Sequence, residues 1–185
     1  MKPMNDYWHI TWVTHNSRIS ERMVKFKAVR GEPVILDEVA ECFVTEIISE
    51  IVCEYKYKIF AYNICRDHIH LILKSPEERI PETVKTIKSL SALRYKEKTD
   101  IPGDGPFRFW AQKYNKWRIE SAEQLKNTVQ YIIYNRMKHK LPENRGLAPH
   151  VLKMLSCCGD EFHAEGYMDE LERTDGCWQG YESTT

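Results

Sequence analysis

The alternation of apolar and polar residues along the chain predicts three strands. Residues 7–14, with the sequence YWHITWVT, place two tryptophans and an isoleucine on one side of an extended chain. Two more short segments, rich in β-branched and other apolar residues, predict strands over residues 58–65 and 68–74. Only Arg66 and Asp67 separate these two, so we expect a tight connection.

Apolar positions three and four residues apart predict helices over residues 37–55, 81–98 and 121–138. The first two begin at Asp37, an N-capping residue, and at Pro81, a residue favoured in a first turn. The third begins at a capping box formed by Ser121 and Gln124. Of the remaining segments, residues 15–36 predict a long loop or small hairpin, and residues 107–119 an extended segment.

The expected order is therefore β-α-β-β-α-β followed by an extra helix. This is the order of the ferredoxin-like split βαβ fold, an α+β architecture in which an antiparallel sheet carries two helices on one face. The fold serves many functions and does not by itself indicate one. After Lys140 the Pro, Gly and acidic content rises, so we expect order to decline and divide the chain into a domain, 1–145, and an acidic tail, 146–185.

Composition supports a single folded domain. The chain has 185 residues, of which 42% are hydrophobic, enough to form a core and to exclude wholesale disorder. No apolar run approaches the ~20 residues that span a bilayer, and the N-terminus lacks the apolar stretch of a secretion signal. We therefore expect a cytoplasmic protein with no membrane partner.

The net charge of zero conceals two oppositely charged parts. Residues 156–185 contain eight acids and one base, a charge of −7, which leaves 26 bases and 19 acids, or +7, in residues 1–155. The basic part could attract a polyanion such as nucleic acid. The alternative is an ordinary domain with a solvated acidic tail.

The six cysteines are expected to be reduced thiols, since no secretion signal is present. Cys42 and Cys53 fall in an apolar helical pattern and suit small core residues. A zinc site formed by Cys157, Cys158, Cys177 and His163 is disfavoured, because their spacing matches no standard zinc motif.

Two histidines form the strongest chemical signal. His68 and His70 are two apart in a predicted strand, so their imidazoles lie on one side, where they could converge on a metal ion. The alternative is a pair of strand histidines without a ligand.

Tyr131 and Asn135 form the second signal, because residues four apart share one face of a helix. The amide oxygen of Asn135 could complete the metal site, and the phenol of Tyr131 could reach a group bound there. The alternative is an amphipathic tyrosine at the boundary between helix and sheet. Tyr134 is a second phenol nearby, on a neighbouring stripe.

Residues 107–118 (FRFWAQKYNKWR) interleave aromatic and basic side chains, as single-stranded nucleic-acid binding requires. An edge strand with its aromatic side chains in the core is an equal alternative. The candidate DNA-binding residues are Arg108, Trp110, Lys113, Tyr114, Lys116, Trp117 and Arg118.

Taken together, residues 7–145 resemble the single-tyrosine HUH transposases, which include the REP-associated tyrosine transposases. The resemblance rests on four motifs in order, at residues 7–12, 67–71, 109–114 and 131–135. It implies that Tyr131, on the extra helix, is the nucleophile and that His68, His70 and Asn135 bind a divalent cation, Mg²⁺ or Mn²⁺. Two departures are Arg66 and Arg136, where many relatives have proline.

The resemblance also implies a reaction and a partner. The substrate would be single-stranded DNA beside a hairpin at an element end, cleaved and rejoined through a 5′-phosphotyrosine intermediate. A homodimer that cleaves in trans is one arrangement among relatives. The alternatives are a replication initiator or relaxase with the same chemistry, a non-catalytic nucleic-acid-binding module, and a metal hydrolase in which water attacks.

Overall fold

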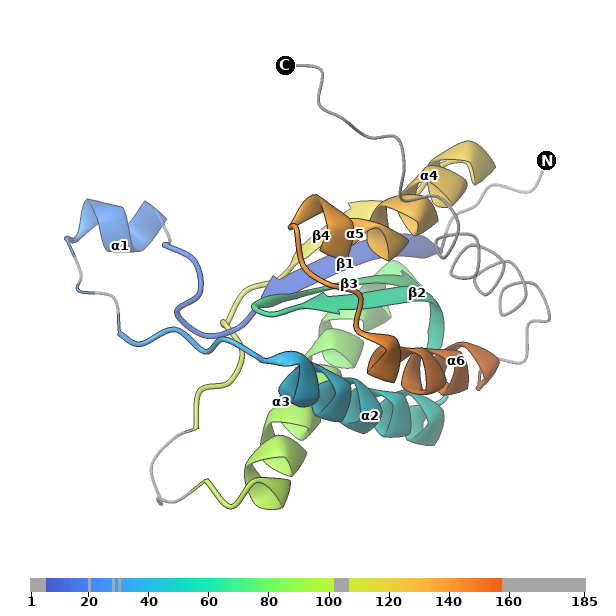
Figure 1. Ribbon diagram of the computed structural model, residues 1–185. Coiled ribbons are helices and arrows are strands. Elements are labelled where there is room, and N and C mark those ends of the chain that lie inside the picture. Colours follow the sequence, from blue (N-terminus) through green and yellow to red (C-terminus); the bar gives the residue numbers. More distant parts are fainter. Residues whose placement is uncertain (1–5, 20, 28, 30, 102–106, 158–185) are drawn as a thin grey trace.

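The fold centres on a four-stranded antiparallel sheet in the order β2-β3-β1-β4 (Figure 1). The computed structural model describes residues 6–19, 21–27, 29, 31–101 and 107–157. Strands β1 (Tyr7–Val13), β2 (Lys58–Cys65) and β3 (His68–Lys74) confirm the predicted segments. The strand order and the helices between the strands confirm the ferredoxin-like α+β prediction.

Two long helices cover one face of the sheet (Figure 1). They are α2 (Glu38–Tyr55) and α3 (Ile80–Lys98), which also pack against each other. The predicted cap of α2 is present, because the Asp37 carboxylate accepts a hydrogen bond from the Ala40 amide at 2.8 Å. Alternate residues of β1 and β3, such as Ile10 and Leu71, are buried on this face and form the apolar core.

The extra helix lies over the opposite face and is interrupted (Figure 1). One helix over residues 121–138 was predicted, but the structure has α4 (Ala122–Ile133) and α5 (Asn135–Lys138). The Asn63 side chain, on β2, donates hydrogen bonds to the carbonyls of Ile132 (2.7 Å) and Ile133 (3.1 Å). In a continuous helix these carbonyls would accept hydrogen bonds from N–H groups of the next turn. The Asn63 side chain donates to them instead, so this contact from the sheet ends α4.

Two other segments differ from the prediction in detail. The predicted loop at 15–36 contains one short helix, α1 (Glu21–Lys25). Within residues 107–119, only β4 (Asn115–Arg118) pairs along an edge of the sheet, and Trp110 forms an isolated bridge with Thr14. The edge position explains why the strand is short and exposed.

The chain continues in order beyond Lys140, where declining order was expected. A 3₁₀ turn, η2 (Arg145–Leu147), leads into α6 (Ala148–Ser156), whose buried residues Met154 and Leu155 belong to the core. This helix packs on α2 (Figure 1). The eight acidic residues of the tail all lie outside the described part, which ends at residue 157.

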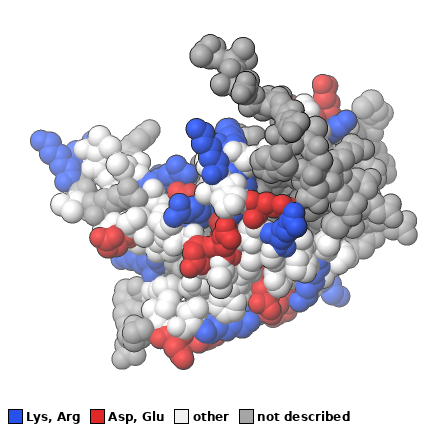
Figure 2. All heavy atoms as spheres, viewed as in Figure 1, with Lys and Arg blue, Asp and Glu red and all other residues white. Residues whose placement is uncertain are grey.

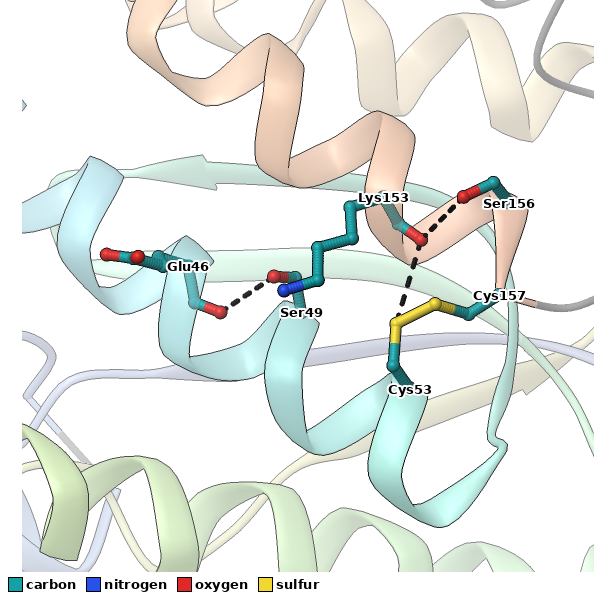
Figure 3. The surroundings of a disulfide bond; sticks show 6 residues. All are labelled: Glu46, Ser49, Cys53, Lys153, Ser156 and Cys157. Carbon is teal, nitrogen blue, oxygen red and sulfur yellow. Dashed lines mark hydrogen bonds between the residues drawn. A yellow bond between two sulfur atoms is a disulfide. The ribbon is translucent and has the colours of Figure 1, made fainter.

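A disulfide joins Cys53 of α2 to Cys157, directly after α6 (Figure 3). The expectation of reduced thiols is therefore wrong for this pair, whose Cα atoms are 5.4 Å apart. Sequence alone did not show that these two cysteines, 104 residues apart, meet when α6 packs on α2. The other candidate zinc ligands, Cys158, His163 and Cys177, lie outside the described residues. Among the residues described, no helix has both the length and the apolar character needed to cross a membrane.

Candidate active site

The two histidines of β3 lie side by side beneath α4 and α5. His68 and His70 are 6% and 8% exposed, and their ring centroids are 5.1 Å apart. The intervening Ile69 points into the apolar core on the other face. The strand therefore presents two imidazoles to one buried polar region.

His68 is held at both ring nitrogens. Its Nδ1 lies 2.7 Å from a carboxylate oxygen of Asp67, and its Nε2 lies 3.0 Å from the amide oxygen of Asn135. Burial would raise the pKa of Asp67, but the hydrogen bond with His68 and the neighbouring cations outweigh it and lower this pKa. Asp67 thus stays ionised and fixes the ring with Nε2 toward Asn135.

Asn135 is fully buried and its side chain is only half satisfied. Its oxygen accepts a hydrogen bond from the Cys65 thiol, with sulfur and oxygen 3.2 Å apart. Burial raises the pKa of this thiol to about 12. Its Nδ2 has no hydrogen-bond partner among the described residues. Such a group is rare in folded proteins and is explained by a functional role, by local strain or by a bound water or ion.

His70 is held by a third histidine that the sequence analysis did not single out. His9, on β1, places Nε2 3.0 Å from Nδ1 of His70. Burial lowers the pKa of His70 to about 3 and that of His9 to about 4. Both rings are therefore neutral at neutral pH, which is the form of imidazole that binds metals.

Tyr131 completes the cluster from α4. Its ring centroid lies 5.4 Å from that of His70 and 5.9 Å from that of His9. The ring is 38% exposed, and the ammonium of Lys138 lies 4.8 Å from its centroid. A partly exposed phenol therefore stands beside the histidines, with a cation over its ring.

The imidazole nitrogens of His68 and His70 and the amide oxygen of Asn135 are suitable ligands for a divalent cation. Two ligands bound to one cation at right angles, each at about 2.1 Å, lie about 3.0 Å apart. The distance between His68 Nε2 and Asn135 Oδ1 is 3.0 Å. Within the described ranges no group of three or more His, Cys, Asp or Glu side chains has the geometry of a metal site, so the set depends on the Asn135 amide.

A buried ion pair between Arg136 and Glu41 supports the position of Asn135. Arg136, next to Asn135, donates to a carboxylate oxygen of Glu41 at 2.7 Å and to the carbonyl of Ile64 at 3.0 Å. The other Glu41 oxygen accepts from the backbone N–H of Arg66 at 2.6 Å. The pair thus ties α2, α5 and the turn before Asp67 together. Sequence analysis noted Arg136 only as a departure, because its partner is 95 residues away.

The predicted DNA-binding residues are not brought together on one surface. Trp110 is buried, and its indole donates to Ser91 at 2.9 Å, so for this residue the edge-strand alternative describes the structure. Lys116 and Arg118 lie over the Trp8 ring, on the side of the sheet away from the histidines. Trp117 lies opposite His9 and faces the histidine side, 51% exposed. Arg108 and Lys113 are exposed, and Tyr114 is half-buried.

Positively and negatively charged side chains are mixed on one face of the molecule. Figure 2 shows Lys and Arg side chains interspersed with Asp and Glu on the face drawn there. The excess of bases in residues 1–155 therefore does not form one continuous basic surface on that face.

Comparison with known proteins identifies the family. Residues 4–135 match the family described as "Transposase IS200 like", and the chain belongs to this family. A comparison with curated proteins gives no significant match.

Two solved structures are similar in fold. One is the REP-associated tyrosine transposase bound to a REP hairpin, with 16% identity, 73% of this chain and 68% of that chain covered, and a TM-score of 0.48. The other is a transposase-like protein from Deinococcus radiodurans R1, with 20% identity, 75% and 93% coverage, and a TM-score of 0.46.

Proposed function

We propose that this protein is a metal-dependent single-stranded DNA transposase and nuclease that cleaves and rejoins DNA through a 5′-phosphotyrosine intermediate. The observation that carries the proposal is the position of the Tyr131 ring, whose centroid lies 5.4 Å from that of His70, itself 5.1 Å from that of His68. Membership of a transposase family supports DNA as the substrate. The hairpin beside the cleaved strand remains an expectation from the resemblance.

His68, His70 and Asn135 would hold the divalent cation, Mg²⁺ or Mn²⁺. When bound, the cation would polarise the scissile phosphate and orient it as a Lewis acid. Asp67 and His9 fix the orientations of the two imidazoles, a role that outer partners of metal-binding histidines commonly have.

Tyr131 is the nucleophile in this proposal. Its oxygen attacks phosphorus in line, a Tyr–O–P bond forms, and the bond from phosphorus to the 3′ oxygen breaks. The phenol proton passes to solvent, and the departing oxygen takes up a proton to become a 3′-hydroxyl. The 3′-hydroxyl of another strand then attacks the same phosphorus and releases Tyr131, so strands are exchanged without a nucleotide cofactor. The Lys138 ammonium stabilises negative charge on the phenol as it develops.

A denaturing gel tests the nucleophile. Wild-type protein, Tyr131→Phe and Tyr134→Phe are incubated with labelled single-stranded hairpin DNA and Mn²⁺. We expect a covalent adduct with wild type and Tyr134→Phe and none with Tyr131→Phe, which still binds DNA. An adduct of full yield with Tyr131→Phe would reject the assignment. Cleavage by wild type without an adduct would instead support a metal hydrolase, and binding without cleavage a non-catalytic module.

A mixing experiment tests whether cleavage acts within one protomer. Tyr131 contacts His70 of its own chain, which supports attack in cis. Combining Tyr131→Phe with His68→Ala, each inactive alone, should then give no adduct. Restored adduct in the mixture would show a homodimer that cleaves in trans.

A further inference from the structure

A cavity of about 610 Å³ adjoins Tyr131. Its walls come from β1, β3, β4 and successive turns of α4, and His68 and Asn135 are not among its lining residues. Its volume falls in the range of ~300–1,000 Å³ that is usual for small-ligand sites. It therefore adjoins the proposed metal site, whose ligand His70 and whose nucleophile Tyr131 are among its lining residues.

The lining is aromatic on one wall and polar on the other. Trp117 is 51% exposed, and its ring is tilted by 36° from that of His9, with centroids 5.4 Å apart. Across the cavity, α4 contributes Glu123, Gln124 and Asn127. Because none of the lining residues is Lys or Arg and one is a carboxylate, the part of the cavity away from Tyr131 and His70 suits an uncharged group better than a phosphate.

A nucleobase fits this combination, since it has a flat aromatic face and an edge of hydrogen-bond donors and acceptors. We propose that the cavity binds the base adjoining the scissile phosphate, with Trp117 stacked on its face and Glu123, Gln124 and Asn127 contacting its edge. The proposal rests on the proposed function, because that function brings the DNA strand to Tyr131.

The negative charge of the Glu123 carboxylate determines which bases we expect the cavity to prefer. An ionised carboxylate only accepts hydrogen bonds. Adenine, cytosine and guanine carry an exocyclic amino group that can donate to it, whereas the one donor of an unpaired thymine is its N3–H, which lies between two carbonyl oxygens that a carboxylate repels. The subsite therefore favours the three amino-bearing bases over thymine at this position.

Binding measured without metal tests the subsite independently of cleavage. Full-length protein in EDTA is titrated with hairpin oligonucleotides that differ only in the base next to the cleavage position. We expect thymine to bind about five- to tenfold more weakly than the other bases. Trp117→Ala should weaken binding of all four about tenfold, and Trp117→Phe, which keeps an aromatic face, by much less.

A pair of acidic variants provides the matched control. Glu123→Gln should reduce the discrimination against thymine, whereas Glu120→Gln removes the same charge outside the cavity and should change all four affinities equally. Equal binding of all bases by wild type, or unchanged affinity in Trp117→Ala, overturns the proposal. If the base preference is present but no covalent adduct forms with Mn²⁺, the subsite stands and the proposed function fails. If the adduct forms without a base preference, the subsite fails and the proposed function stands.

Discussion

The two faces of the sheet both contain buried side chains, but of different kinds. On the face under α2 and α3, Ile10 and Leu71 are at most 1% exposed and pack among other apolar side chains. On the face under α4 and α5, Asn63, His68 and His70 are only 6–8% exposed, and each makes a side-chain hydrogen bond. We call these the apolar face and the polar face.

The two faces differ in the free energy of burying their side chains. Burying apolar area is favourable in itself, at roughly 25 cal/mol per Å². Burying imidazole and amide groups is unfavourable unless each finds a partner. The apolar face should therefore determine stability, and the polar face the chemistry.

Replacing the histidines of the polar face should remove activity without unfolding the protein. In the double variant His68→Ala, His70→Ala, we expect metal-dependent DNA cleavage to fall more than about 100-fold, because the proposed cation loses two of its three ligands. Cleavage is followed on denaturing gels and Mn²⁺ binding by calorimetry. The thermal unfolding midpoint is measured alongside to show that the variant is folded, and cleavage at the wild-type rate would disprove the metal site.

Breaking the buried ion pair between Glu41 and Arg136 should affect both stability and activity. The pair connects α2, on the apolar face, to α5, on the polar face. Glu41→Ala leaves the Arg136 charge buried without its carboxylate, and we expect the free energy of unfolding to fall by about 3–5 kcal/mol. Denaturant titration measures the change. The control Glu54→Ala removes an exposed pair with Arg94 and should cost less than about 1 kcal/mol. Similar losses for both variants would show that the buried pair has no special role.

A cavity on the apolar face should lower stability and leave the chemistry intact. Ile48→Ala, at a fully buried position of α2, should cost about 2–5 kcal/mol. Val39→Ala lies on the same helix at a position that is 78% exposed and should cost less than about 0.5 kcal/mol. Adduct yield per folded molecule should match wild type in both, and a selective loss of adduct in Ile48→Ala would contradict the division.

Removing the disulfide tests whether α6 belongs to the stable part of the fold. Cys53→Ser opens a loop of about 100 residues, and we expect a loss of about 2–4 kcal/mol. Chemical denaturation with and without dithiothreitol measures it. The reductant should destabilise wild type to the level of the variant and leave the variant unchanged; a wild-type protein insensitive to reductant would show that the bond does not contribute.

The smallest effect is expected at the residue that orients His70. His9→Phe keeps a ring and removes the hydrogen bond to His70, so we expect Mn²⁺ affinity to fall about 10- to 100-fold. Calorimetry without DNA provides a measurement independent of activity. His9→Gln retains a hydrogen-bonding group and should recover part of the affinity, whereas equal affinity in His9→Phe and wild type would exclude an orienting role.

Local patterns predicted much of the fold and part of the candidate site. The period of two in β1 and β3 predicted that His68 and His70 share a side, and the spacing of four predicted that Tyr131 and Asn135 share a face. The first prediction needed only the geometry of β3, whereas the second assumed one continuous helix, which the structure divides between α4 and α5. The interruption of the last helix at Tyr134 was not predicted, since Asn63, which caps its carbonyls, comes from another element.

Patterns among residues close in the chain predict the strands, the main helices, their caps and the alternation that makes one face of the sheet apolar, because these features depend on neighbours within a few residues. The contacts of His9 with His70, of Arg136 with Glu41 and of Cys53 with Cys157 arise only when the chain folds. Each of these pairs is separated by more than 60 residues, and strand register and helix packing bring its members together. A buried polar group is stable only when its hydrogen-bond or ionic partner is in place. The candidate active site of this protein therefore depends on contacts between residues far apart in the chain, which local sequence patterns do not predict.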